Sequence, residues 1–332
     1  MKRLESFLRP DQKRLFEMLR NMFKGRVICR KKAYVLVHGE APILLVAHLD
    51  TVHEQPVLDI CTSKDGNILM SPQGIGGDDR CGVYAICSAY ELSKVKPWLL
   101  FTCDEEVGGV GADEFVSDHI KKKLPKGLDD LKLIVEVDRR GSRDAVYYDC
   151  DNEQFEDYIT SKGFKTEYGS FSDISVIAPE LGVAAVNLSS GYYNAHTLHE
   201  YIVRPQLEKT TLAVADIVED ASHEDFPKFE YVSAFYPNGY YDGPLFGIRT
   251  ETFKKLESMP KRKTPAHGRK DLPPQYREMY DELLYYYTER ELDDYREMYG
   301  DEVIKLLFDD EFGPEYGSAK LEKLGEDEED LK

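Results

Sequence analysis

Continuous apolar runs recur along the first 220 residues of the chain and are separated by amphipathic stretches. The runs are ILLVAH (43–48), PWLLFTC (97–103), LKLIVEVD (131–138) and GVAAVNLS (182–189). Such runs are typical of parallel strands that are covered on both faces. The first three predict buried strands of one sheet, with AVYYD (145–149) as a fourth, and GVAAVNLS predicts a further strand.

Shorter signals fill the spaces between these runs. Apolar residues recur at helical intervals in 3–24, 79–93, 153–164 and 205–220, and a short helix is expected near 111–118. Strands are expected at 26–39 as well as at 145–149, and a hairpin is expected around Asp65-Gly66. Strands that alternate with helices predict an α/β fold. We expect three αβα layers with a mostly parallel central sheet.

The character of the chain changes after residue 222. Aromatic and turn residues come first, then a basic stretch with prolines at 259–274, then a helical pattern rich in tyrosines and acids. The last residues, GEDEEDLK, form an acidic tail that we expect to be disordered. The expected parts are therefore a core domain over 1–221, an aromatic-rich and helical C-terminal extension over 222–322, and a tail over 323–332.

Composition excludes several classes of partner. The net charge of −19 argues against binding to nucleic acid or to anionic membranes, because both require basic surfaces. No stretch resembles a membrane helix or a signal peptide. The six cysteines form no CxxC pair, which favours free thiols in a reducing compartment. We expect a cytoplasmic protein.

Five segments carry acidic or imidazole groups at the ends of these runs or in loops. They are AHLDTV (His48, Asp50), GIGGDDRCG (Asp78, Asp79), FTCDEEVGGVG (Glu105, Glu106), VEVDRRG (Asp138) and NAHTLHEY (His196, His199). Charged groups at the ends of buried strands are costly unless a metal or a partner compensates them. Ligand sites of parallel sheets gather at the carboxyl ends of strands. The pattern predicts a hydrolytic site with two metal ions.

Each residue type suits one task at such a site. Asp78, in a loop at a helix entry, is the expected bridge between the two ions. His48 and Asp138 would complete the ligands of one ion, and Glu106 and His196 those of the other. Asp50 would accept the second N–H of the His48 ring, and Glu105 would act as general base. Nitrogen and oxygen ligands suit two Zn²⁺ ions, and also Co²⁺ or Mn²⁺.

These motifs resemble those of the co-catalytic zinc exopeptidases and amidohydrolases, such as bacterial leucyl aminopeptidase, peptidase T, carboxypeptidase G and succinyl-diaminopimelate desuccinylase. HLDTV resembles their first-ligand motif, GGDDRCG their GxxDDKxG segment, DEEVGGVG their base-and-ligand pair, and HTLHEY their H-x-x-x-E-Y. The resemblance covers roughly 1–220. It implies a zinc-exopeptidase-like fold and the roles given above for Glu105, Asp50 and the five ligands.

Two departures from the family pattern matter. Arg80 stands where many relatives carry lysine. The stretch between Asp138 and His196 is too short for the lid and dimerisation domain of the carboxypeptidase G type. The chain therefore resembles a compact form without a lid.

Several alternatives remain open. His199 competes with His196 as a ligand, although the H-x-x-x-E-Y alignment favours His196. Asp173, Tyr192 and Tyr193 are candidate walls of a substrate pocket, with Asp173 as an anchor for a substrate amine. The expected activity is that of an aminopeptidase or dipeptidase. The alternatives are an amidohydrolase acting on an N-acyl amino acid, or a metal-binding adaptor without activity. The oligomeric state stays open.

Overall fold

The structure is a computed structural model that describes residues 3–169, 171–233, 268–284 and 300–312, together with 289, 292, 293, 295 and 296. The chain divides into two compact units, Met1–Gly239 and Tyr240–Lys332. We describe each unit by itself. The boundary predicted at residue 221 stays a prediction, and the tail predicted at 323–332 lies outside the described residues.

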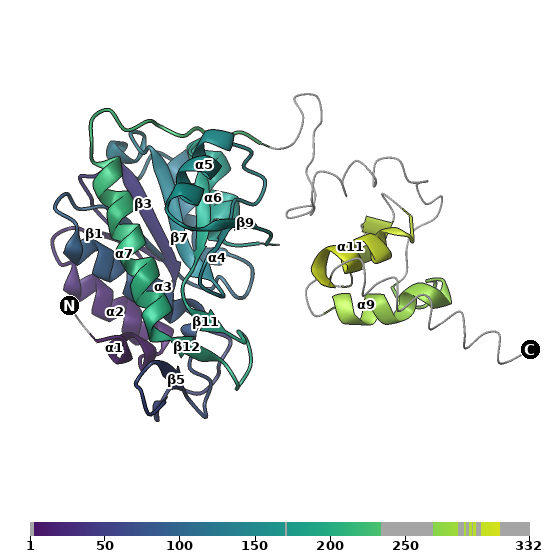
Figure 1. The fold of residues 1–332 in the computed structure, drawn as a ribbon. Helices are drawn as coiled ribbons and strands as arrows, with labels where there is room; N and C mark the ends of the chain where they lie inside the picture. The colour runs from purple at the N-terminus through teal and green to yellow at the C-terminus, as the bar shows by residue number, and fades with distance from the viewer. Residues whose placement is uncertain are drawn as a thin grey trace, which may run out of the picture. The chain divides into compact units, whose positions relative to one another are not determined.

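An eight-stranded sheet forms the centre of the first unit (Figure 1). Its strands, in spatial order, are β1 (Val27–Arg30), β2 (Tyr34–Val37), β6 (Trp98–Thr102), β3 (Ile43–His48), β7 (Leu133–Arg139), β10 (Ala185–Ser189), β8 (Asp144–Val146) and β9 (Lys165–Glu167). The central strands β6, β3, β7 and β10 are parallel. Antiparallel pairing occurs between β1 and β2, between β2 and β6, and between β10 and β8. The four long apolar runs thus form the parallel centre.

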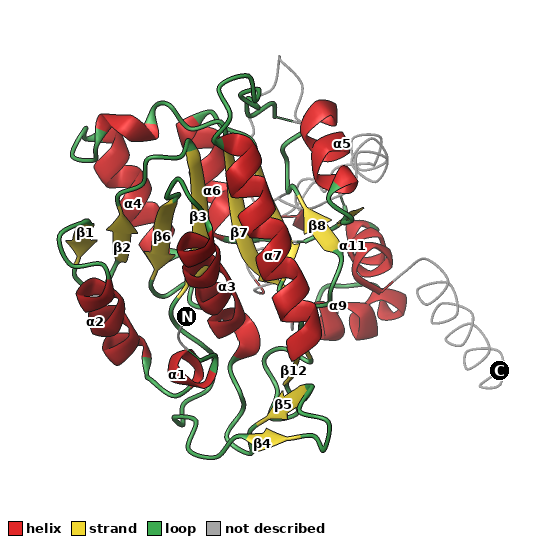
Figure 2. Ribbon diagram, turned by 60° about the vertical axis from the view of Figure 1, so that its left-hand side comes forward, coloured by secondary structure: helices red, strands yellow, loops and turns green. Residues whose placement is uncertain are grey.

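Helices cover both faces of this sheet (Figure 2). The helices of the unit are α1 (Glu5–Leu8), α2 (Gln12–Met22), α3 (Gly77–Leu92), α4 (Val110–Ile120), α5 (Glu153–Ser161), α6 (Asp173–Leu181) and α7 (Arg204–Ala221), with a 3₁₀ turn at Lys126–Leu128. Side chains alternate along β3: Leu45 packs in the core under α2, α3 and α7, whereas Leu44 packs in the core under α4 and α6. A strand buried on both faces needs apolar residues throughout, which explains the continuous runs.

A second, antiparallel sheet joins two distant parts of the chain. Its strands, in spatial order, are β11 (Tyr192–Tyr193), β12 (Tyr201–Val203), β5 (Ile68–Met70) and β4 (Cys61–Thr62). The β4–β5 hairpin turns at Asp65 and Gly66, as predicted. Because β5 pairs with β12, the loop around His196 is anchored near the start of α3.

The second unit contains a 3₁₀ turn at Pro274–Tyr276 and the helices α9 (Arg277–Leu283) and α11 (Val303–Phe312). A fully buried arginine organises it: Arg296 contacts Asp271, Asp293 and Asp301 at 2.5–2.9 Å. A buried guanidinium is stable only when carboxylates and carbonyls satisfy it, as they do here.

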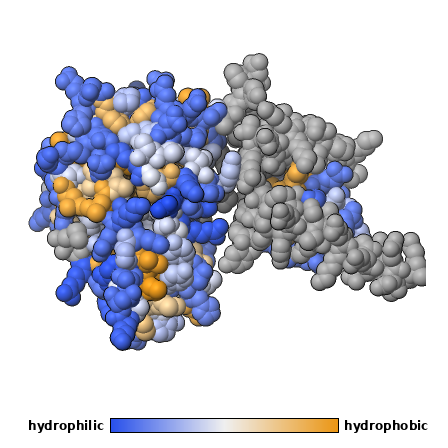
Figure 3. Space-filling model, in the orientation of Figure 1, coloured by the Kyte–Doolittle hydropathy of each residue, from blue (hydrophilic) through white to orange (hydrophobic). Residues whose placement is uncertain are grey.

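The predicted fold class is confirmed, with differences in detail. The helix expected over 3–24 is two helices, α1 and α2, because Pro10 cannot continue a helix. No helix was predicted over 173–181, where α6 begins at Asp173, with Ser172 and Ser175 forming a capping box. Within the described residues no helix is long and apolar enough to cross a bilayer. The face of the first unit in Figure 3 is mostly hydrophilic, with scattered apolar residues.

Candidate metal centre

Strand order brings three of the sequence motifs together. His48 is the last residue of β3, Asp138 lies next to the end of β7, and Glu105 and Glu106 follow shortly after β6. Because β3 lies between β6 and β7 and all three are parallel, their carboxyl ends meet at one edge of the sheet. This is the place where sites form in parallel sheets.

The buried imidazole of His48 lies among carboxylates. Its Nε2 is 3.2 Å from Oδ1 of Asp78 and 3.6 Å from Oδ1 of Asp138. Burial alone would lower the pKa of His48, but the charge of Asp138 and hydrogen bonds with Asp138, Asp50 and Asp78 raise it well above its ordinary value. The surrounding carboxylates therefore favour positive charge at this position.

Asp78 presents its two oxygens to two different imidazoles. Oδ1 faces His48, and Oδ2 lies 3.3 Å from Nε2 of His196. The same nitrogen of His196 lies 3.1 Å from Oε2 of Glu106. Hydrogen bonds with Asp78 and Glu106 raise the pKa of His196 to about 11, although partial burial opposes this. The carboxylate of Asp78 thus connects two sets of donors.

The backbone around Asp78 explains this position. Gly76 adopts a left-handed conformation ahead of α3, and Asp78 itself has non-helical dihedral angles. Glu200, fully buried, accepts the N–H groups of Gly76 and Asp78 at 2.8 and 2.9 Å, and contacts Nε2 of His53 at 2.9 Å. Glu200 was quoted in the HTLHEY motif, but sequence reasoning assigned it no role. It holds the loop that presents Asp78.

Asp50 ties His48 to the loop after β6. Its Oδ1 lies 3.3 Å from Nδ1 of His48 and accepts the N–H of Glu105 at 3.1 Å, while Oδ2 accepts the N–H of Glu106 at 3.0 Å. The contact with Nδ1 directs the Nε2 of His48 toward Asp78 and Asp138. One carboxylate therefore orients both a ring and a loop.

Glu105 is partly buried beside these groups. Burial raises the pKa of Glu105 well above its ordinary value; the charges of Asp138 and Asp173 add to this effect, and His48 opposes it. A carboxylate with a raised pKa is a better proton acceptor, as a general base requires.

Hydrogen bonds with three neighbouring side chains hold Asp138 in position. Its Oδ1 lies 3.2 Å from the hydroxyl of Tyr192, Oδ2 lies 3.4 Å from Ser172 Oγ, and its N–H donates to Asn187 at 2.8 Å. Burial and the charge of Asp78 raise the pKa of Asp138 to about 7. Ser172 and Asn187 carried no signal in the sequence, because they support a ligand only through the fold.

The three residues that we predicted as walls of a substrate pocket do not belong to the lining of the cavity described below, and their role in substrate binding stays a prediction. Tyr192 is buried behind Asp138, and the hydroxyl of Tyr193 donates to Gln206 at 2.7 Å. Asp173 is fully buried and bonds to Thr102. Since no oxygen of Asp173 reaches the surface, this geometry gives no support to its predicted role as an amine anchor.

The donors fit a metal centre. Ligand atoms of His48, Asp78 and Glu106 lie within 4.8 Å of one another, as do those of His48, Asp79 and Asp138. Oε1 of Glu106 is buried without a hydrogen-bond partner, which a cation would relieve. Asp79 instead accepts the N–H groups of His48 and Gly82 at 3.2 and 2.9 Å. We therefore regard Asp79 as support for the backbone.

The two histidines of the last motif differ in position. His196, at a left-handed backbone position, directs Nε2 to Asp78 and Glu106. His199 is exposed, and its main chain contacts Thr197 and Asn194. The geometry therefore favours His196 as the ligand.

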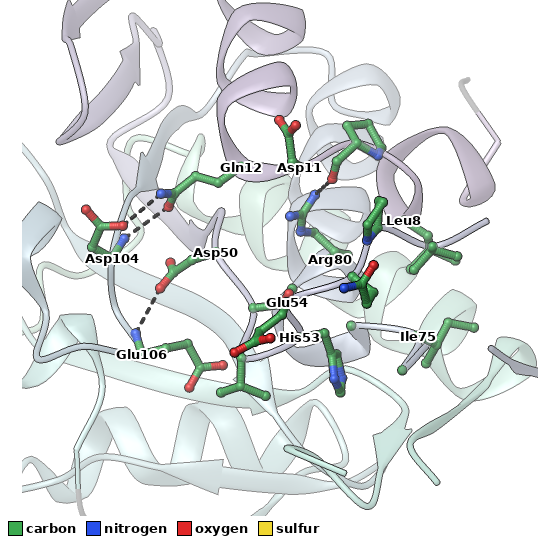
Figure 4. Close-up of a pocket in the computed structure, with 18 of the residues that line it drawn as sticks. Leu8, Asp11, Gln12, Asp50, His53, Glu54, Ile75, Arg80, Asp104 and Glu106 are labelled. Carbon is green, nitrogen blue, oxygen red and sulfur yellow. Dashed lines mark hydrogen bonds between the residues drawn. The ribbon is translucent and has the colours of Figure 1, made fainter. Parts of the chain in front are cut away.

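A cavity of about 670 Å³ opens next to Glu106 and Asp50 (Figure 4). Its walls come from the N-terminal helices, the loop after β3, the loop before α3 and the loop after β6. Arg80 is the single arginine or lysine in this lining. A substrate in the cavity would lie beside the candidate metal centre.

No family model matches the sequence, and no curated protein matches it. Solved structures do match. Aminopeptidase PepT from Bacillus cereus aligns with a TM-score of 0.50 at 14% identity, covering 66% of this chain and 97% of PepT. An aminopeptidase from the archaeon Desulfurococcus kamchatkensis aligns with a TM-score of 0.49 at 14% identity, covering 66% and 94%. The likeness to PepT shows that the first part of this chain has the same α/β fold as that aminopeptidase.

Proposed function

We propose that the protein hydrolyses a peptide bond with the help of two zinc ions and the general base Glu105. The observation that carries this proposal is the position of Asp78, whose two oxygens face His48 and His196 at 3.2 and 3.3 Å. A carboxylate placed in this way is what a bridging ligand requires.

Five residues would hold the ions. His48 and Asp138 would bind one ion, Glu106 and His196 would bind the other, and Asp78 would bind both. When bound, the ions would polarise the carbonyl of the substrate and lower the pKa of the attacking water. Cobalt or manganese suits the same nitrogen and oxygen donors.

Glu105 would transfer one proton in two stages. Its carboxylate takes a proton from the water as the water oxygen forms a bond to the carbonyl carbon. The protonated carboxyl then donates that proton to the leaving nitrogen as the C–N bond breaks. The raised pKa of Glu105 suits both stages.

The proposed substrate is a short peptide with a free amino terminus, as for an aminopeptidase or a dipeptidase. The same attack serves any amide, so an N-acyl amino acid is the alternative substrate. All six cysteines are free thiols, in agreement with the cytoplasmic location that we propose from the sequence.

Matched dipeptides with free and acylated amino termini test the proposal, with zinc or cobalt added and the Glu105→Gln protein as the blank. Cleavage of the free-amine set alone is the expected result. Cleavage of the acylated set alone would identify an amidohydrolase. Turnover no higher than the blank on both sets would overturn the proposal and favour an adaptor without activity.

A further inference from the structure

The N-terminal helices form one wall of the cavity beside the candidate metal centre. Leu8, Pro10, Asp11 and Gln12 line it from this side (Figure 4). Buried apolar residues anchor these helices in the core: Leu4, Phe7, Leu8, Leu15, Phe16 and Leu19. The wall is therefore part of the folded domain.

Gln12 joins this wall to the loop after β6. Its Nε2 donates to Oδ1 of Asp104 at 2.7 Å, and its Oε1 accepts the N–H of Asp104 at 3.1 Å (Figure 4). The two bonds determine the orientation of the amide, because a flipped amide would lose both of them. One side chain thus holds both the backbone and the side chain of Asp104.

Asp104 immediately precedes the proposed base Glu105 and the proposed ligand Glu106. Its φ of 59° lies in the left-handed region, which a residue other than glycine adopts at a cost. Asp50 accepts the next two N–H groups, at 3.1 and 3.0 Å. Gln12 and Asp50 therefore together hold three consecutive residues of the loop.

Arg80 holds the N-terminal segment in place by hydrogen bonds to its backbone. It is 3% exposed, and its Nη1 donates to the carbonyl oxygens of Phe7 and Pro10 at 3.2 and 2.7 Å. Asp11 caps α2 by accepting the N–H of Arg14 at 2.7 Å. Because Gln12 is the first residue of α2, these contacts determine where its amide lies.

We propose that Gln12 is a positioning residue that holds the loop carrying Glu105 and Glu106 in its working conformation. This proposal rests on the proposed function, because it assigns Gln12 a task in that reaction. Removal of a partner that hydrogen-bonds to a metal ligand typically changes metal affinity or activity by about 10–100-fold, and Gln12, which acts through Asp104, should have a smaller effect.

A cycle of variants isolates the contact. Gln12→Ala removes both bonds. Gln12→Glu places a carboxylate against that of Asp104, which repels it. Combining Gln12→Glu with Asp104→Asn restores the side-chain bond with donor and acceptor exchanged, because the asparagine amide can donate to the glutamate, while the N–H of residue 104 still donates to residue 12. Gln154→Ala, at an exposed position of α5, is the matched control.

Two readouts decide the outcome: kcat and KM on the best dipeptide, and affinity for Co²⁺ measured by its absorption bands. We expect Gln12→Ala and Gln12→Glu to lower kcat by up to about 10-fold with little change in KM, which is the lower end of the effect of a direct partner of a ligand. Both should also weaken Co²⁺ binding. The double variant should recover a large part of both losses, and Gln154→Ala should match the unmodified protein.

Wild-type values for Gln12→Ala in both readouts would overturn the proposal. Failure of the double variant to recover, with circular dichroism showing equal loss of structure in all Gln12 variants, would assign Gln12 to folding only. If the unmodified protein hydrolyses no peptide, the proposed function fails, but the order of Co²⁺ affinities still decides whether Gln12 positions the loop.

Discussion

Nε2 of His196 lies 3.1 Å from Oε2 of Glu106, although one residue comes from the loop between β11 and β12 and the other from the loop after β6. The small antiparallel sheet makes this contact possible, because β12 pairs with β5 and brings the His196 loop toward the entry of α3. The same nitrogen faces Asp78. Three motifs that are far apart in the sequence thus contribute to one set of donors.

Replacing His196 with alanine should reduce the metal content from two ions to about one, because its Nε2 completes the set formed with Glu106 and Asp78. His199→Ala is the matched control, since His199 is exposed three residues away. Metal analysis by mass spectrometry after gel filtration measures the stoichiometry. Loss of an ion in His199→Ala alone would reassign the ligand.

Asp78→Ala should remove both ions, because its two oxygens serve both donor sets. Zinc at about 100 times its Kd should stabilise the unmodified protein by about 2.7 kcal/mol for each ion bound. We expect Asp78→Ala to abolish the zinc-dependent rise in Tm, and Asp157→Ala, at an exposed position of α5, to retain it. A full zinc-dependent rise in the Asp78 variant would exclude Asp78 as the bridge.

Glu105→Gln should lower kcat by about 10²–10⁴-fold, because the amide cannot accept the proton of the attacking water. Metal content should stay unchanged, since Glu105 belongs to neither donor set. Peptide hydrolysis and metal analysis on one preparation measure both quantities. Glu153→Gln, in the first turn of α5, is the control. Near-normal turnover in the Glu105 variant would remove this residue from the role of base.

Asp118 should make the first unit sensitive to acid. Burial alone would raise its pKa, but hydrogen bonds from Lys123 at 2.9 Å, Tyr34 at 2.8 Å and Arg30 at 2.9 Å lower it to about 2. Because the folded pKa lies below the unfolded value, this stabilisation is present above about pH 4 and is lost as the pH falls toward 2.

Asp118→Asn should therefore cost about 1–3 kcal/mol of unfolding free energy at pH 7. The difference from the unmodified protein should shrink at pH 3 and below. Urea unfolding at both pH values measures this, with the exposed Asp129→Asn as the control. An equal difference at both pH values would show that the charge of Asp118 does not contribute.

The local pattern of apolar and polar residues was sufficient to predict many of the strands and helices. The run ILLVAH predicted a strand over 43–48, and β3 spans Ile43–His48, because apolar residues throughout are needed by a strand covered on both faces. The same kind of pattern did not predict helix α6, because Pro179 lies within this helix of nine residues and weakens the helical signal. The tyrosine-rich pattern after residue 276 predicted helix, and the described part contains α9 and α11.

For the candidate site, the sequence alone specified the donor types and placed His48, Glu105, Glu106 and Asp138 at the ends of buried strands, where charged groups are too costly without compensation. Which donors face one another depended on the strand order β6–β3–β7 and on the pairing of β5 with β12. These relations join residues far apart in the chain, so no local pattern contains them. Only the tertiary structure therefore brought Gln12 to Asp104 and Glu200 to the loop of Asp78.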